Sequence, residues 1–168
     1  MRPNTKLGEI ADIYQPQTIA STDCNSGQYL VYGANGVIGR YNQYNHEQPQ
    51  ICITCRGNTC GTVNFSEPFS WITGNAMVIN VDNYRNVNKR YLFHYLSAQN
   101  FHNIISGSGQ PQIVRSPLQK LPIYLPQIQM QVKLSEMLDL LGRRLKTEQN
   151  ILDKYQRQKA YLLQNMFI

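Results

Sequence analysis

Three polar stretches of the sequence carry arginine and amide side chains that could pair with nucleic-acid bases. A guanidinium can pair with guanine or a phosphate, and the amides of Asn and Gln can pair with adenine edges. The candidate contacts are Asn35 and Arg40 around a glycine-rich turn, Arg56, Asn58 and Thr59 in a second turn, and Gln110, Gln112 and Arg115 after a predicted helix. Taken singly, each stretch is also typical of a plain surface loop.

The four cysteines, Cys24, Cys52, Cys55 and Cys60, allow two interpretations. The spacing Cys52-x-x-Cys55 is that of a zinc site, which Cys60 and Cys24 would complete. However, Ile51–Thr54 alternates as a strand does, and residues three apart on a strand point to opposite faces. We therefore expect small, buried thiols and no metal site.

Residues that could catalyse a reaction are not grouped in the sequence. The six acidic residues before Pro126 are scattered, whereas a nuclease clusters carboxylates around metal ions. His46, His94 and His102 have no metal-ligand spacing and are expected at structural or surface positions. The glycine-rich stretch 32–39 lacks the Gly-Lys-Ser/Thr of a phosphate-binding loop, and neither motif of an amino-group methyltransferase occurs. We expect no catalytic residue, no metal and no cofactor.

The composition favours a folded, basic protein. Of 168 residues 42% are apolar, which is enough for a core, and the net charge is +6 although only 15% are charged. Asn and Gln make up close to a fifth of the chain. Such a surface suits a nucleic-acid partner, although a solvated surface can have the same composition. No apolar run is long enough for a membrane span and the start is not a secretory signal, so we expect a cytoplasmic protein.

Residues 1–126 are expected to position the polar stretches as an α+β, target-binding domain with an irregular, dominant sheet. Short apolar runs between turn signals predict strands, and helical spacing of apolar residues predicts two helices. The predicted strands are Gln28–Tyr32, Gln50–Cys55, Gly61–Phe65, Ala76–Val81 and Leu121–Leu125, and the predicted helices are Leu7–Ile13 and Asn88–Ile105. We expect Tyr32, Tyr41 and Trp71 in the core in preference to stacking on bases.

Residues 127–168 have the pattern of one long C-terminal helix. From Gln127 to Met166 there is no proline and one glycine, and apolar residues recur at alternating steps of four and three. This heptad seam consists of Leu134, Leu138, Leu141, Leu145, Glu148, Leu152, Tyr155, Lys159, Leu162 and Met166. At 1.5 Å per residue it spans on the order of 50 Å, more than a domain of this size can cover. The sustained heptad favours a coiled coil with a partner over an amphipathic helix packed on its own domain.

The two charged positions of the seam indicate how a pair of such helices would align. A parallel pair would place Glu148 against Glu148 and Lys159 against Lys159, and like charges repel. An antiparallel pair with Glu148 opposite Lys159 neutralises both charges. The same register places Leu145 opposite Leu162, Leu152 opposite Tyr155 and Leu141 opposite Met166. We therefore expect antiparallel pairing, with a second copy or with another half of the same kind.

Several stretches occur together in a characteristic order. They are Lys6–Asp12, Tyr32–Gly39, Arg56-Gly57 before Cys60-Gly61, Gly109–Gln112, Leu121–Pro126 followed by Gln131, and Leu162–Phe167. In this order they resemble the target-recognition domain and conserved helix of type I restriction–modification specificity subunits, over nearly the whole chain. Full subunits of that family have two recognition domains and two such helices, whereas this chain has one of each. A natural half-subunit, a C-terminal half of a longer or rearranged gene product, and a designed fragment all fit this difference.

The resemblance implies a non-catalytic protein that binds double-stranded DNA and reads one half of a split site. It also implies that the helices space two recognition domains and bind the methyltransferase (modification) subunits and, through them, the restriction subunit. The alternative is a protein–protein adaptor with a coiled-coil tail, which explains the heptads but leaves the basic, amide-rich loops without a role. A small catalytic domain would need an acid–base or nucleophile group that the sequence does not display.

Overall fold

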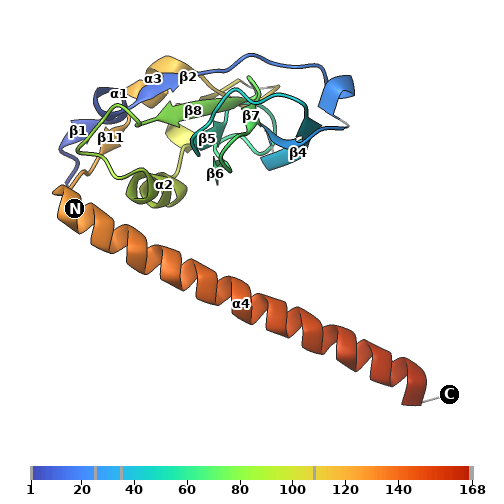
Figure 1. Cartoon of the computed structure of the whole chain (residues 1–168). Helices are drawn as coiled ribbons and strands as arrows, with labels where there is room; N and C mark the ends of the chain where they lie inside the picture. Colours follow the sequence, from blue (N-terminus) through green and yellow to red (C-terminus); the bar gives the residue numbers. More distant parts are fainter. Residues whose placement is uncertain (1, 25, 35, 108, 167–168) are drawn as a thin grey trace.

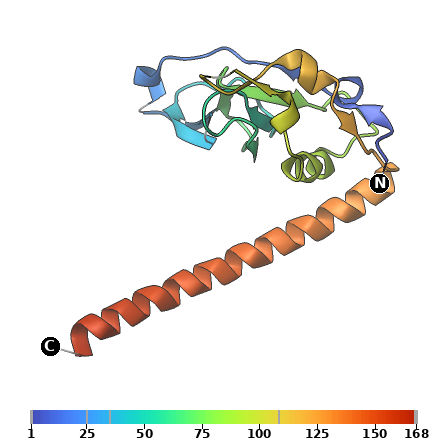
Figure 2. The ribbon, with the colours of Figure 1, turned by 180° about the vertical axis from the view of Figure 1, so that it is seen from behind.

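The computed structural model describes residues 2–24, 26–34, 36–107 and 109–166. An α+β domain is followed by a long helix, α4 (Ile128–Met166), which leaves one end of the domain and extends beneath it (Figures 1 and 2). The other helices are α1 (Leu7–Ile10), α2 (Lys89–Ser97) and α3 (Arg115–Gln119), with 3-10 turns η1 (Ser21–Cys24) and η2 (His102–Ile104). None of the helices in the described part of the chain is apolar enough over its length to span a lipid bilayer.

The strands form two sheets and two short pairs. They are β1 (Thr5–Lys6), β2 (Asp12–Tyr14), β3 (Tyr29–Gly33), β4 (Gly36–Tyr41), β5 (Ile51–Thr54), β6 (Val63–Phe65), β7 (Trp71–Ile72), β8 (Ala76–Asn80), β9 (Ile105–Ser106), β10 (Gln112–Ile113) and β11 (Pro122–Ile123). The larger sheet has the order β2-β8-β5-β6 and is antiparallel throughout. The second has the order β4-β3-β7, in which β3 and β7 are parallel. The pair β1–β11 joins the start of the chain to the segment that leads into α4.

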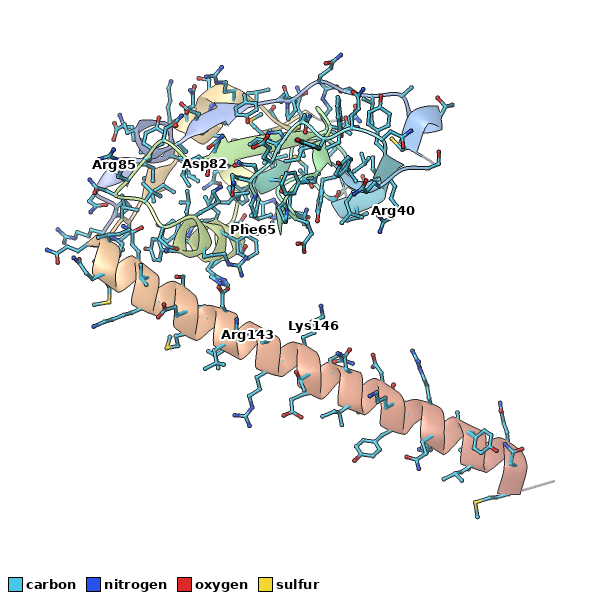
Figure 3. The ribbon with its side chains drawn as sticks, in the orientation of Figure 1. Arg40, Phe65, Asp82, Arg85, Arg143 and Lys146 are labelled. Atoms are coloured by element: carbon cyan, nitrogen blue, oxygen red, sulfur yellow. The ribbon has the colours of Figure 1, made fainter. Side chains whose placement is uncertain are left out.

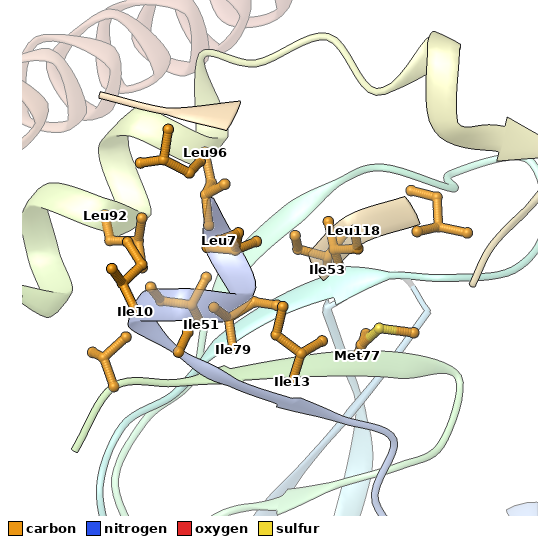
Figure 4. Packing of buried hydrophobic residues seen from close by; sticks show 14 of the residues in the cluster. Leu7, Ile10, Ile13, Ile51, Ile53, Met77, Ile79, Leu92, Leu96 and Leu118 are labelled. Atoms are coloured by element: carbon orange, nitrogen blue, oxygen red, sulfur yellow. The ribbon is translucent and has the colours of Figure 1, made fainter. Parts of the chain in front are cut away.

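The central strands β5 and β8 are buried on both faces. Ile51, Ile53, Met77 and Ile79 face the main core, where the three short helices contribute Leu7, Leu92, Leu96 and Leu118 (Figure 4). The alternate residues Cys52 and Val78 lie in a second cluster with Tyr32 and Ile72 of the smaller sheet. This two-sided burial explains why the two strands read as continuous apolar runs in the sequence.

The loop before β5 connects the two sheets through polar side chains. The Asn45 amide donates to the carbonyl of Ile72 (3.0 Å) and its Oδ1 accepts from the Ile72 N–H (2.8 Å). That oxygen also accepts from His46 Nδ1 (2.6 Å), which leaves Nε2 to accept from the hydroxyl of Tyr14 on β2 (2.9 Å). Burial lowers the pKa of His46, which favours the neutral ring that accepts from Tyr14.

The expected α+β class and long C-terminal helix are confirmed, and each predicted strand overlaps an observed strand. The two shorter predicted helices were too long. The first ends at Ile10, because Ala11 is extended and the following residues pair with β8. The second ends at Ser97, and Ile105 lies in β9, paired with Ile113. In both cases an apolar pattern that suits a helix is overridden by strand pairing.

The aromatic residues of the smaller sheet lie in the core, as expected. Tyr32 and Trp71 are buried, and the half-buried ring of Tyr41 packs edge-on against Trp71 at 5.2 Å between centroids. The stretch expected to be a tight turn after Tyr32 is the turn of the β3–β4 hairpin, whose register runs from Gly33 opposite Gly36 to Tyr29 opposite Tyr41.

Candidate DNA interface

Two of the polar stretches singled out in the sequence lie side by side. Arg56 forms an antiparallel bridge with Gln112. The N–H of Gly57 donates to the carbonyl of Pro111 (3.0 Å), and the N–H of Ile113 donates to the carbonyl of Cys55 (3.0 Å). Directly opposite residues in an antiparallel pair carry side chains on the same face, so Arg56 and Gln112 share one surface.

The turn that carries Arg56 is also held against the glycine-rich hairpin turn. Gly57 and Gly61 adopt the left-handed φ values of +84° and +93° that let the chain reverse. The hydroxyl of Thr59 donates to the carbonyl of Ala34 (3.1 Å), and so does the hydroxyl of Thr54. Thr59 therefore joins two of the three loops. Asn35, the next residue of the hairpin turn, lies outside the described residues.

The surface formed by these loops has donors that the rest of the chain does not use. Arg56, Asn58, Gln110, Gln112 and Arg115 are exposed. Within the described residues, the side chains of Arg56, Asn58, Gln110 and Arg115 take part in no hydrogen bond or ion pair. No acidic residue occurs in 33–36, 56–61 or 107–115. The arrangement can therefore present guanidinium and amide groups to an anionic partner.

Arg40 and Arg115 lie further from this centre. Arg40 is on strand β4 opposite Leu30, toward the open end of the hairpin, and its Nη1 donates to the carbonyl of Gln28 (2.8 Å). The structure thus does not bring Arg40 together with Arg56, and Figure 3 places it at the end of the domain away from Arg85. Arg115 is the first residue of α3, three residues beyond Gln112, and lies at the edge of the surface.

The cysteines are placed as separate, mostly buried thiols. Cys52 and Cys55 belong to different clusters on opposite faces of the sheet, as their spacing on a strand predicts. Burial raises the pKa of Cys52 to about 12, so it stays protonated and is a poor metal ligand. In the described ranges no group of three His, Cys, Asp or Glu side chains is arranged to hold a metal ion.

Helix α4 begins with a buried anchor. Gln131 has no exposed surface, and its Oε1 accepts from the N–H of Asn88 (2.8 Å). Its Nε2 donates to the carbonyls of Asn86 (3.0 Å) and Pro126 (2.7 Å). One side chain thus ties the first turn of α4 to the start of α2 and to the end of the domain. Ser135, one turn later, is also buried.

A second contact lies two turns beyond this anchor, and we name it the junction clamp: Arg90 and His94 of α2 with Asp139 of α4. Arg90 donates from Nε to Oδ2 of Asp139 (3.0 Å) and from Nη2 to Oδ1. His94 Nε2 lies 2.7 Å from the same Oδ1. The Arg90 guanidinium also packs over the rings of Phe65 (4.5 Å) and Phe93 (5.0 Å). The hydrogen bond from Arg90 is the main cause that lowers the pKa of Asp139.

The heptad seam of α4 is not covered by its own domain. Leu134 is half-buried, and every residue from 140 to 166 except Asp153 is exposed, so the seam residues Leu138, Leu141, Leu145, Glu148, Leu152, Tyr155, Lys159, Leu162 and Met166 face solvent. Leu145 is 71% exposed and Met166 is 69% exposed. A largely apolar stripe of this length on a single chain indicates an interaction surface.

Sequence reasoning missed the junction clamp and the role of Gln131 as a buried anchor of α4. Two signals were present: Arg90 and His94 are spaced i, i+4 on one helix face, and Asp139 lies off the heptad seam. Neither signal indicates that these faces of α2 and α4 meet, because Arg90 and His94 lie more than forty residues before Asp139 in the sequence.

Comparison with known proteins assigns the family. The model of the type I restriction modification DNA specificity domain matches residues 4–156. The chain belongs to this family. Two curated specificity subunits of type I restriction enzymes resemble it: the EcoprrI specificity subunit of Escherichia coli, 29% identical over 138 residues, and the putative specificity subunit S.HindORF215P of Haemophilus influenzae (strain ATCC 51907 / DSM 11121 / KW20 / Rd), 28% identical over 141 residues.

These specificity subunits are longer than this chain. The matches cover 79% and 80% of the chain but 34% and 36% of the two relatives, so the chain spans about a third of their length. Its fold is similar to the crystal structure of the type I S subunit from M. genitalium, with a TM-score of 0.78 at 15% identity, covering 98% of this chain and 46% of that one. The likeness extends over the domain and α4 together.

Proposed function

We propose that this specificity domain reads one half of a split DNA site and pairs through α4 with a second copy or with another half of the same kind. The observation that supports DNA reading most directly is the bridge between Arg56 and Gln112. It brings a guanidinium and an amide, the two groups suited to guanine and adenine, onto one exposed surface, and the loop stretches 33–36, 56–61 and 107–115 contain no acidic residue. Asn58, Thr59, Gln110 and Arg115 are further candidates on that surface. Arg40 is a candidate that lies apart from it, and Asn35 is a candidate from the sequence that lies outside the described residues.

The test of DNA reading is the variant Arg56→Ala in the enzyme assembled with its modification subunit. Methylation mapping in cells first gives the recognised motif of the wild type. Loss of a bidentate base contact should then lower affinity for that motif by about 1–3 kcal/mol and relax preference at one base pair. Arg85→Ala is the matched control, because Arg85 is an exposed arginine outside the three loops. Equal affinity and equal sequence preference of wild type and Arg56→Ala would refute the assignment.

The proposed pairing is antiparallel, with Glu148 opposite Lys159. The exposed seam supports it, since two copies would cover each other's apolar stripe and neutralise both charges. In this register the two Leu134 residues lie roughly 58 Å apart, which caps the separation of the domains near 17 base pairs. Because the domains lean inward to meet DNA, half-sites about one helical turn apart, centre to centre, are expected.

Charge reversal tests this register. Glu148→Lys alone should weaken dimerisation by placing two lysines in contact, and adding Lys159→Glu should restore it. Sedimentation equilibrium measures both. Glu136→Lys is the control, because Glu136 is an exposed acid of α4 outside the seam. A double variant that dimerises no better than the single one would show that another register, or no pairing, applies.

A seven-residue insertion near Asp153 tests the same pairing as a spacer, because it keeps the heptad phase and lengthens both helices. It should move the domains apart by roughly 10 Å and widen the unread gap by about three base pairs. An unchanged gap would show that α4 does not space the half-sites.

The same proposal places catalysis in other subunits. The purified chain should transfer no methyl group and cut no DNA alone, and should act in the cytoplasm with methyltransferase subunits and, through them, the restriction subunit. The salt dependence of DNA affinity distinguishes this role from that of a protein–protein adaptor, because affinity that rests on phosphate contacts falls steeply as ionic strength rises. DNA binding that is absent, or independent of salt, would favour the adaptor. Methyl transfer by the chain alone would refute the non-catalytic role.

A further inference from the structure

The junction clamp is the last place where the described part of α4 is held by the domain. Every residue from 140 to 166 except Asp153 is exposed. An open space beside the clamp is lined by Arg90, His94 and Asp139 and continues along Gly142, Arg143 and Lys146 of α4. Figure 3 shows Lys146 projecting from α4 toward the domain across this space. The direction in which the long helix leaves the domain is therefore decided before Gly142.

Two contacts along one rigid helix decide its direction. Gln131 fixes the position of the first turn, but a single point of attachment would leave the helix free to swing. Asp139 is held eight residues later, roughly 12 Å along the axis. Gln131 contacts the segment just before α2, and Asp139 contacts α2 itself. Because both points are held, the helix has one orientation relative to the domain.

The chemistry of the clamp makes this second contact directional. Arg90 binds both carboxylate oxygens of Asp139 through a planar fork, which restricts the approach of the carboxylate in a way that a lysine ammonium does not. The rings of Phe65 and Phe93 hold the guanidinium plane from the domain side. His94 supplies a third nitrogen to the same carboxylate.

Building on the proposed function, we propose that the junction clamp sets the length of the unread gap between the two half-sites, with Asp139 as its positioning residue. In a pair of chains the paired helices are the shared frame, and each recognition surface is placed by the angle at its own junction. From Asp139 to Met166 the helix runs roughly 40 Å, so a swing of about 10° at the junction displaces its far end by about 7 Å relative to the domain. A released clamp should thus let one enzyme accept neighbouring gap lengths.

The first experiment measures the angle without DNA. Nitroxide labels are placed at Lys120→Cys on the domain and Gln156→Cys on α4, both exposed, in a Cys60→Ser background. The other three cysteines are buried. Labelled chain is mixed with excess unlabelled chain, so that pulsed EPR reports distances within one chain. Asp139→Asn should broaden the distance distribution by about 5 Å, because the second label lies roughly 26 Å beyond the clamp.

The second experiment measures the gap. Cells carrying the chain with its modification subunit are mapped for methylated sites. Wild type should give one gap length, whereas Asp139→Asn and Arg90→Lys should add gaps longer or shorter by one or two base pairs, with the half-site sequences unchanged. Asp153→Asn is the matched control: the same change on the same helix, beyond the clamp, where the carboxylate contacts only Gln149 of its own helix.

The outcomes separate this inference from the function on which it rests. A wild type without any split motif refutes the proposed function, and the gap-setting role with it. A split motif with the same single gap in wild type, Asp139→Asn and Arg90→Lys refutes the clamp's role alone. So does an unchanged EPR distribution in both clamp variants. Arg90→Lys keeps the charge of the site, so it tests the fork geometry if Asp139→Asn lowers expression of folded chain.

Discussion

Replacing the buried Gln131 with leucine should destabilise the protein more than any other change of that type on α4. The side chain is fully buried and makes three hydrogen bonds to backbone groups. Leucine has a similar size but no polar atom. It therefore leaves the N–H of Asn88 without an acceptor at the start of α2, and two carbonyls without this donor.

The magnitude follows from the surroundings of these groups. An orphaned, buried backbone group costs about 1–3 kcal/mol. Asn88 is half-buried, so its N–H carries most of the penalty, whereas the carbonyls of exposed Asn86 and half-buried Pro126 can recover part of theirs from water. Leucine also gains burial of apolar surface. The balance is a loss of about 2–4 kcal/mol in the free energy of unfolding.

Urea unfolding at one fixed protein concentration measures this loss, because pairing of chains adds to apparent stability. Trp71 is the only tryptophan and lies in the core, so its fluorescence reports the domain. With a slope of about 2 kcal/mol per molar urea, the midpoint should fall by about 1–2 M. Gln164→Leu, at an exposed position of the same helix, should change the free energy by less than about 0.5 kcal/mol. Equal midpoints for the two variants would refute the anchor.

Three further changes test the fold. Burial lowers the pKa of His46, so the unfolded chain takes up the proton first. The urea midpoint should fall as the pH drops below the ordinary histidine value of about 6.5, and this dependence should weaken in Tyr14→Phe, which no longer donates to the neutral ring. Gly142→Ala should raise stability by about 0.5–1 kcal/mol in thermal melts, because a methyl group there meets nothing within 4 Å. Gly39→Ala should lower stability by about 1–3 kcal/mol, because its Cβ would lie 2.1 Å from the carbonyl oxygen of Cys24. Unchanged urea midpoints for Gly39→Ala would contradict the close packing of that hairpin.

Local patterns in the sequence determined the parts of this protein that depend on local physics. The heptad from Leu134 to Met166 predicted α4, because a helix satisfies its own backbone hydrogen bonds and needs no distant partner to define its bounds. Alternation in β5 predicted that Cys52 and Cys55 face opposite sides, which follows from strand geometry alone. The polar turns around Arg56 and Gln112 were recognisable for the same reason, since glycine and asparagine mark chain reversals wherever they occur.

Tertiary structure alone decided which of these parts meet. Strand bonds join residues far apart in the chain, and the register that brings Arg56 beside Gln112 or ends the first helix at Ile10 is set by partners that no local window contains. The same holds for Asp139. The sequence pattern predicts a solvated acidic residue on a helix, and only the packing of α2 against α4 shows that Arg90 and His94 contact it. The sequence determines the chemistry of each side chain. Whether two groups touch depends on the packing of whole helices and strands, and that packing sets the direction of α4.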